Sequence, residues 1–519
     1  MTLRPLDITV IVVYFLGLLW LGLRLSTKQK SREDYFLGDR QVPWWLAGIS
    51  VFATLLSTVT YVALPGEMIK NGIGFFTHLF AFLFIVPLVT WVVIPALMRL
   101  RVTSIYDYLE KRFGAPARTV CAAVFVFMRL IWLGLILYTA ALAISPVTGG
   151  DMDKAAQHDQ MQKLIIVSGI VTVFYTTLGG MRAVIWSDFA QFVILMGGAI
   201  LIPIHVAFQT SSGPDVWWAA FSEAGRTEFD VFSHDPTQRT SVFGLILAIF
   251  FWNICTHSSD QVAAQRYLST TSTDSARRAF WVCSVANIAL VLLLMTTGLA
   301  LFYSRFHQSA QSISDFQRNI APVADKVLPK FIAGLPDGLS GLMVAALLAA
   351  AMSSLASGIN SISTVIVSDL LPNREGSSED STNLAHPRVL AMGSGIVGIA
   401  FSLVVNYLMM HDFEWNLVDL IERVNHLFVG PLGAVFFSGM LCRHVGLAAV
   451  MLGFVAGVAT SNWIAFSKWF SIDEVSFMWI MPASFAVTMG VAFVAGWFFS
   501  PPNLKQLDSL YMGRTRGRD

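Results

Sequence analysis

Blocks of about twenty or more apolar residues recur along the whole chain, and they limit its fold more than any other feature. A helix of that length crosses the ~30 Å hydrocarbon core of a bilayer. Only 13% of the 519 residues are charged, whereas a soluble domain carries roughly 25%. We therefore expect an all-α polytopic membrane protein with about thirteen transmembrane helices. The predicted spans are 8–26, 42–65, 75–98, 118–145, 162–178, 183–208, 240–258, 278–304, 337–370, 387–410, 413–441, 445–466 and 476–499.

The basic residues predict how these spans are oriented. Lysine and arginine gather in the loops after odd-numbered spans and in the tail, as they do on the cytoplasmic side of membranes. The loops after even-numbered spans are mixed or acidic. The longer segment 305–335 is the exception. We expect a multi-pass protein of a plasma or bacterial inner membrane, with its N-terminus outside and its C-terminus in the cytoplasm. The basic residues are Lys28, Lys30, Arg32, Arg40, Arg99, Arg101, Lys111, Arg112, Arg182, Arg266, Arg277, Arg278, Arg374, Arg443, Lys505, Arg514, Arg516 and Arg518.

Three serines stand in the span 337–370, where a lipid-facing helix would carry Leu or Val. Ser353 and Ser357 are four residues apart and share a helix face, and Ser354 lies beside them. Small residues at nearly every turn let neighbouring helices approach closely, and hydroxyls find partners across such interfaces. The pattern fits either a packing seam or a cluster of oxygen ligands for a hard cation such as sodium.

The span 42–65 also carries hydroxyls at membrane depth, namely Ser50, Thr54, Ser57, Thr58 and Thr60. Together with β-branched neighbours and the dipeptide at 65–66, Pro-Gly, they suggest a helix that breaks at mid-depth. A broken helix exposes main-chain carbonyls, which coordinate sodium where they line a cavity. The alternative is an intact packing helix.

Ionisable residues inside the spans are candidates for function because each is costly when unpaired. Asp188 lies about 9 Å into its span at 1.5 Å per residue, so it needs a cation, unless it caps the helix. Asp260 is a candidate near the end of span 240–258, and the alternative is a solvated helix end. Arg423 is a candidate to bind a solute oxygen or carboxylate at a pocket wall, and the alternative is an inert pair with Glu422. Arg129 lies nearer the inner end of its span, where snorkelling to the interface is at least as plausible.

The sequence lacks the patterns of an enzyme or of a nucleic-acid-binding protein. It contains no nucleophile–base pair at a recognisable spacing, no phosphate-binding loop and no cluster of metal-binding His and Cys residues. The four cysteines have no metal-ligand spacing. The formal net charge of +1 does not indicate a nucleic-acid partner. We expect no catalytic residue, and no cofactor apart from sodium as a coupling ion.

Several motifs resemble those of the sodium:solute symporter family, over residues from about Asp34 to Cys442. Each motif alone is weak, but their order along some thirteen spans is specific. They are YFLGDRQVPWW (35–45), DYLEKRF (107–113), LGGMRAVIWSD (178–188), DQVAAQR (260–266), AAMSS (350–354) and NS (360–361).

The resemblance implies a LeuT-like fold with two inverted five-helix repeats, one extra helix before them and two after. Residues 1–41 would hold the extra helix and an inner loop, and 42–208 the first repeat. An extracellular loop would follow at 209–239, the second repeat at 240–441, and the last two helices with a cytoplasmic tail at 442–519.

The resemblance also implies sodium sites. The common site of the family falls on the residues Ala53, Leu56, Ala350, Ser353 and Ser354. A possible second sodium falls on Asp188, Ser353 and Ser357. However, Ala356 stands where members that bind two sodium ions tend to have another serine, which puts the second ion in doubt.

The solute pocket of the family falls on Ser57, Thr60, Trp132, Asp260 and Arg423. Sialic acid transporters have an arginine at the position of Trp132, and sugar transporters tend to have a glutamine at the position of Arg423. The expected function is therefore sodium-coupled uptake of a small organic solute, favouring a carboxylate or other anion. A sugar or polyol, coupling to protons, and a membrane protein that binds solute without coupled flux are the alternatives. The oligomeric state is left open.

Overall fold

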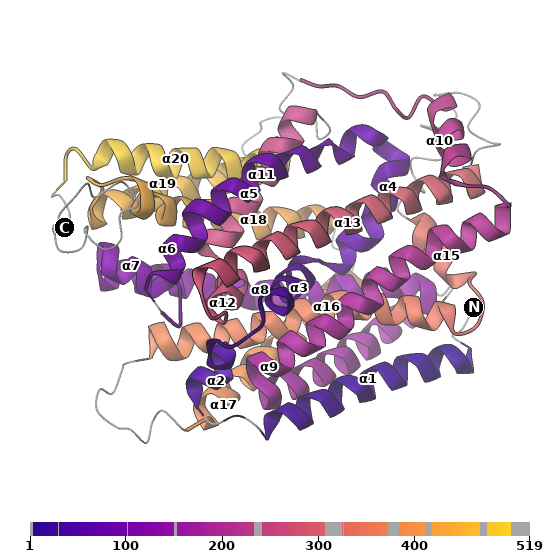
Figure 1. The fold of residues 1–519 in the computed structure, drawn as a ribbon, viewed down its shortest axis with the longest axis horizontal. Helices are drawn as coiled ribbons and strands as arrows, with labels where there is room; N and C mark the ends of the chain where they lie inside the picture. Colours follow the sequence, from indigo (N-terminus) through magenta and orange to yellow (C-terminus); the bar gives the residue numbers. More distant parts are fainter. Residues whose placement is uncertain are drawn as a thin grey trace.

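The computed structural model describes residues 4–27, 29, 31–100, 102–149, 153–232, 241–306, 324, 326–371, 383–410, 417–467 and 475–499. Over these ranges the chain folds into helices, and its only β-pairing is one isolated bridge between Val42 and Thr270. Figure 1 shows the long helices running roughly along one direction, with short helices at the two ends of the bundle. Such a bundle satisfies its main-chain hydrogen bonds within each helix, as a bilayer requires.

The long helices follow the predicted order. The first part contains α1 (Pro5–Ser26), α3 (Trp44–Leu55), α4 (Thr58–Asn71), η2 (Ile73–Ala81), α5 (Phe82–Leu88), η3 (Val89–Val93), α6 (Ile94–Met98), α8 (Ala115–Gly149) and α9 (Lys154–Thr210). The second contains α11 (Val242–Ser259), α12 (Gln261–Leu268), α13 (Thr273–Phe306), α16 (Leu339–Val365), η6 (Ile366–Leu370), α17 (Ala385–Met410) and α18 (Leu417–Leu441). The chain continues in α19 (Leu447–Ala465), η9 (Phe477–Trp479) and α20 (Ile480–Ala495). The short helices are α2 (Arg32–Leu37), η1 (Gly38–Arg40), α7 (Tyr106–Phe113), α10 (Pro214–Glu223) and α15 (Val327–Ala333).

Ten helices in the described part of the chain are long and apolar enough to cross a membrane, or eleven if the bent pair α3–α4 is one crossing. The predicted number of thirteen stays a prediction. Two predicted spans, 162–178 and 183–208, form the single 57-residue helix α9. A straight helix of that length would measure ~86 Å, far more than one bilayer core.

Gly180 bends α9 between the two predicted spans 162–178 and 183–208. Its φ of +53° lies in the left-handed region that favours glycine. A Cβ at this position would lie 2.8 Å from the Tyr35 carbonyl oxygen, so the close approach of α2 also requires glycine. The bend allows the one helix to supply the two crossings that the sequence predicts.

Helix α16 lies at the centre of the bundle. Its apolar window is 94% buried, compared with 22% for α1 at the edge. Small residues make this central position possible, since a Cβ on Gly358 would lie 2.5 Å from a methyl carbon of Leu133 in α8. The serines of the predicted cluster therefore lie in the protein interior and not against lipid.

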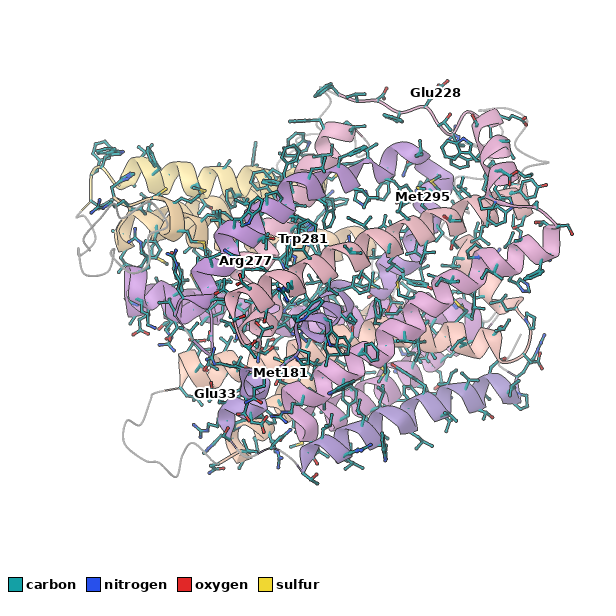
Figure 2. All side chains as sticks on the ribbon, in the orientation of Figure 1. Glu33, Met181, Glu228, Arg277, Trp281 and Met295 are labelled. Atoms are coloured by element: carbon teal, nitrogen blue, oxygen red, sulfur yellow. The ribbon has the colours of Figure 1, made fainter. Side chains whose placement is uncertain are left out.

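Large apolar side chains project from the outer helices, as expected for a surface in contact with lipid (Figure 2). Trp281 of α13 is one of them, at 53% exposure. The segment 209–239, which the sequence makes long enough for a short interfacial helix or a lid, contains the short helix α10, and α10 packs Phe221 against Phe302 of α13 with ring centroids 5.3 Å apart. The composition of segment 371–386 is typical of a flexible inner linker, and this segment falls largely outside the described residues. The tail beyond residue 499 falls wholly outside them.

Candidate functional site

The predicted break in span 42–65 is present, but at an earlier place than the Pro-Gly dipeptide suggests. Helices α3 and α4 meet at a bend of 72°. Leu56 and Ser57 between them are extended, whereas Pro65 lies inside α4. Ser57 starts the new helix because its hydroxyl accepts a hydrogen bond from the Thr60 N–H at 3.1 Å. The last carbonyls of α3 are thereby left without helical partners.

Two serines of α16 supply partners for those carbonyls. The Ser353 hydroxyl donates to the Ala53 carbonyl at 2.5 Å and lies 3.4 Å from the Ala350 carbonyl. The Ser354 hydroxyl donates to the Thr54 carbonyl at 2.8 Å and to the Leu56 carbonyl at 3.2 Å. The structure thus brings together all the residues predicted for the common sodium site.

A second polar cluster lies next to this point, around the buried Asp188 of α9. One of its carboxylate oxygens, Oδ2, accepts hydrogen bonds from Ser50 at 2.5 Å and from Thr54 at 3.4 Å. Thr54 in turn shares a 2.8 Å hydrogen bond with Ser357 of α16. Asp188 and Ser357, two of the residues predicted for a second sodium, therefore meet through Thr54, whereas Ser353 is directed at the Ala53 carbonyl.

Arg266 of α12 completes this cluster, which corrects its interpretation as a charge in an inner loop. The residue is fully buried, and its guanidinium lies 3.5 Å from Oδ2 of Asp188. It donates to Ser50 at 2.8 Å and also to Ser357. A buried carboxylate needs a countercharge, and this requirement was the signal for a nearby basic residue. The sequence did not identify Arg266 as that basic residue, because Arg266 stands next to a predicted loop.

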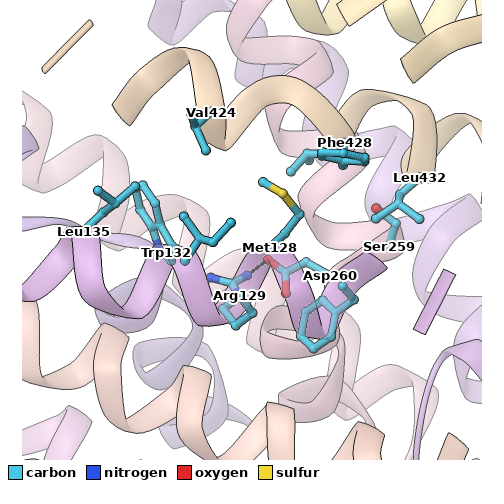
Figure 3. A pocket seen from close by; sticks show the side chains of 12 residues that line it. Met128, Arg129, Trp132, Leu135, Ser259, Asp260, Val424, Phe428 and Leu432 are labelled. Atoms are coloured by element: carbon cyan, nitrogen blue, oxygen red, sulfur yellow. Dashed lines mark hydrogen bonds and ion pairs between the residues drawn. The ribbon is translucent and has the colours of Figure 1, made fainter. Parts of the chain in front are cut away.

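A second helix break occurs at Asp260, between α11 and α12. Asp260 is extended, and its Oδ1 caps α12 by accepting from the Val262 N–H at 2.9 Å. Its Oδ2 forms an ion pair with Arg129 of α8 (Figure 3). Arg129 is therefore held inside the protein and does not snorkel to the interface.

A cavity of about 40 Å³, with room for a few water molecules, lies beside this ion pair. Its walls come from α8, the α11–α12 break and α18, and they are mostly apolar (Figure 3). The lining residues are Phe125, Met128, Arg129, Ile131, Trp132, Leu135, Ser259, Asp260, Val424, Phe428, Val429 and Leu432.

Two of the residues predicted for the solute pocket, Trp132 and Asp260, line this cavity, and three do not. Ser57 and Thr60 bond to each other at 2.9 Å at the start of α4. Arg423 donates to the Ala465 carbonyl of α19 at 2.6 Å. The guanidinium in the cavity wall therefore belongs to Arg129.

Sodium-coupled transporters are prominent among the proteins that this chain resembles. It is 29% identical to the sodium/sialic acid symporter SiaT of Proteus mirabilis over 465 residues, which cover 87% of the chain and 88% of the relative. It is 28% identical to the sodium/sialic acid symporter NanT of Aliivibrio fischeri, covering 88% and 87%. It is also 28% identical to human sodium-coupled monocarboxylate transporter 1, over 84% of the chain and 68% of the relative.

Solved structures agree on the LeuT-like fold. The substrate-bound, outward-open structure of a Na⁺-coupled sialic acid symporter matches 97% of this chain and 100% of its own, with a TM-score of 0.81 at 26% identity. Mhp1, a nucleobase-cation-symport-1 family transporter in a closed conformation, matches 92% of this chain and 97% of its own with a TM-score of 0.52. At 12% identity the likeness to Mhp1 shows the fold alone. Because the family profile matches residues 35–457, most of the sequence, the chain belongs to the sodium:solute symporter family.

Proposed function

We propose that this symporter binds a sodium ion where the α3–α4 break meets α16, and that the ion drives import of a small carboxylate. Family membership makes the protein a sodium-coupled secondary transporter of a small solute, and not an enzyme. The observation that carries the sodium assignment is the convergence of the Ser353 and Ser354 hydroxyls on main-chain carbonyls at the break.

The groups at this point suit a hard cation. The carbonyls of Ala53, Leu56 and Ala350 and two serine hydroxyls are all neutral oxygen ligands, which such ions prefer. Each hydroxyl now donates its proton to a carbonyl, and rotation of the O–H bond would direct its lone pairs at an ion. The Ala53 and Leu56 carbonyls belong to a broken helix, whereas the serines and the Ala350 carbonyl belong to α16, so a bound ion would hold these two elements together.

The energy available from one sodium ion is sufficient for solute accumulation. One charge moving through about 100 mV releases ~2.3 kcal/mol, and a tenfold concentration gradient adds ~1.4 kcal/mol. The total of ~3.7 kcal/mol corresponds to a solute gradient of several hundred-fold. A single ion at the α3–α16 site would therefore be enough for uptake against a large gradient.

Removal of the serine hydroxyls tests the sodium site. In proteoliposomes, Ser353→Ala and Ser354→Ala should each raise the half-saturating sodium concentration roughly tenfold or more, because a hydrogen bond or ligand to a charged group contributes about 1.5–3 kcal/mol. Ser363→Ala is a matched control, since its hydroxyl donates to the Pro387 carbonyl elsewhere on the same helix. Unchanged sodium dependence in the double variant Ser353→Ala/Ser354→Ala would show that the site is misassigned.

The assignment of a carboxylate solute is supported by Arg129. A guanidinium has five N–H donors, and the pair with Asp260 uses only one of its nitrogens. Asp260 keeps its capping bond to α12 whether or not Arg129 is shared, so a solute carboxylate can share Arg129 with it. The remaining wall is largely apolar, including Phe125, Trp132 and Phe428, which suits a monocarboxylate better than a polyhydroxylated sugar.

Substitution of Arg129 tests the solute class. Thermal-shift titration of the purified protein with lactate, N-acetylneuraminate, glucose and inositol should show sodium-dependent stabilisation by a carboxylate. Arg129→Gln should weaken that binding at least tenfold, because a charge-assisted contact is lost. Arg423→Gln should leave carboxylate affinity within about twofold of wild type, because Arg423 faces Ala465. Stabilisation by glucose or inositol alone would favour the sugar alternative.

We infer in addition that the protein lies in a plasma or bacterial inner membrane with the N-terminus outside and the C-terminus in the cytoplasm. The inner-loop basic residues support this orientation even after Arg266 is removed from the count.

Solute uptake measured with sodium replaced by choline at fixed pH separates sodium coupling from proton coupling. Solute leak without accumulation would indicate uncoupled flux.

A further inference from the structure

Four elements of the bundle meet at the carboxylate of Asp188. Asp188 comes from α9, Arg266 from α12, Ser50 and Thr54 from α3, and Ser357 from α16. Arg266, Asp188, Ser50 and Ser357 are fully buried, and Thr54 is 6% exposed. Whatever neutralises Asp188 must therefore be a part of the protein or an ion that enters this interior.

Arg266 already occupies the position of a countercharge. Its guanidinium contacts Oδ2 of Asp188 at 3.5 Å and donates to the Ser357 hydroxyl, which a second sodium would need as a ligand. It also donates to Ser50, which bonds the same carboxylate oxygen. A sodium ion added here would place two cations beside one carboxylate in a medium of low dielectric, where like charges repel strongly.

The remaining oxygens form a poor cation site. Ala356, next to Ser357 in α16, has no side-chain oxygen to offer an ion. Ser353 is engaged by the Ala53 carbonyl. Among the side-chain oxygens of this cluster in the described part of the chain, Oδ1 of Asp188 is the one without a hydrogen-bond partner, so it is the side-chain oxygen that a second ion would find unoccupied.

We propose that Arg266 is the built-in countercharge of Asp188, and that the chain couples a single sodium ion to each solute. The ion is the one between α3 and α16, so this inference rests on the proposed function. The predicted second sodium is the competing interpretation of the same cluster. Arg266 also links α12 to α3, α9 and α16, so it holds the segment before the first helix break and the segment after the second in register without an ion.

Equilibrium binding of ²²Na⁺ to the purified full-length protein in detergent tests the proposal, with sodium itself as the probe. Wild type should bind one ion per chain with a Hill coefficient near one. The double variant Ser353→Ala/Ser354→Ala should bind no ion. The folded fraction of Asp188→Asn should still bind one ion per chain. Arg266→Gln, which frees the carboxylate, should raise the count from one to two, an effect that loss of packing alone would not produce.

The outcomes separate the two assignments. Two ions per wild-type chain, reduced to one in Asp188→Asn, would overturn the role of Arg266 and leave the proposed sodium site intact. No bound ion, or binding that survives Ser353→Ala/Ser354→Ala, would overturn the α3–α16 site and with it this inference. The wild-type count tests the number of ions even where a variant does not fold, and the folded variants show which site holds them.

Discussion

Asp7 belongs to α1 but caps a different helix. Its Oδ1 accepts hydrogen bonds from the N–H groups of Gly338 and Gly341, at 2.7 and 2.8 Å, at the start of α16. The carboxylate is 2% exposed and lies at the positive end of the helix dipole. One residue of a peripheral helix thus supplies the N-cap of the central helix that carries Ser353 and Ser354.

Asp7→Ala should therefore destabilise the protein by about 1–3 kcal/mol, because it leaves the half-buried Gly338 N–H and the buried Gly341 N–H without an acceptor and removes the bond to the Arg4 N–H. Thermal unfolding in detergent, followed by intrinsic fluorescence, measures the change in Tm. Thr9→Ala is the matched control, since the Thr9 hydroxyl is exposed and donates only to the Pro5 carbonyl of its own helix. Equal Tm values for both variants would contradict the capping role.

At the scale of helices, the apolar blocks predicted most elements closely. The span predicted at 337–370 corresponds to α16 and η6, over Leu339–Leu370, and the span predicted at 387–410 corresponds to α17. These predictions succeed because a lipid-crossing helix must be both long and apolar, and both properties are local in the sequence. The five residues predicted for the common sodium site also come together in the structure, as the resemblance implied.

The sequence predicted the irregular parts less well, because tertiary partners decide them. The α3–α4 break lies at Leu56 and Ser57, where serines of α16 bond the freed carbonyls, and Pro65 continues α4 instead of ending it. At Asp260 the sequence suggested a solvated helix end, yet the structure has a helix break held by Arg129. Burial of Arg266 likewise depends on a carboxylate that is distant in the sequence.

At the scale of the whole molecule, the two ends of the bundle differ in charge and in the short helices they carry. Helix α10 lies at the same end of the bundle as the amino end of α1, and α7 lies at the other end (Figure 1). Lys111 of α7 belongs to the basic loops that are retained on the cytoplasmic side, so α7 should face the cytoplasm and α10 the outside.

Cysteine labelling measures this orientation against a low background, because Cys121, Cys255, Cys283 and Cys442 are all buried. Glu223→Cys in α10 and Lys111→Cys in α7 place thiols at exposed positions on opposite ends. In intact cells a membrane-impermeant maleimide should label Glu223→Cys and leave Lys111→Cys unmodified until the membrane is permeabilised. The reverse pattern would invert the topology, and sodium would then reach the α3–α16 site first from the opposite side of the membrane.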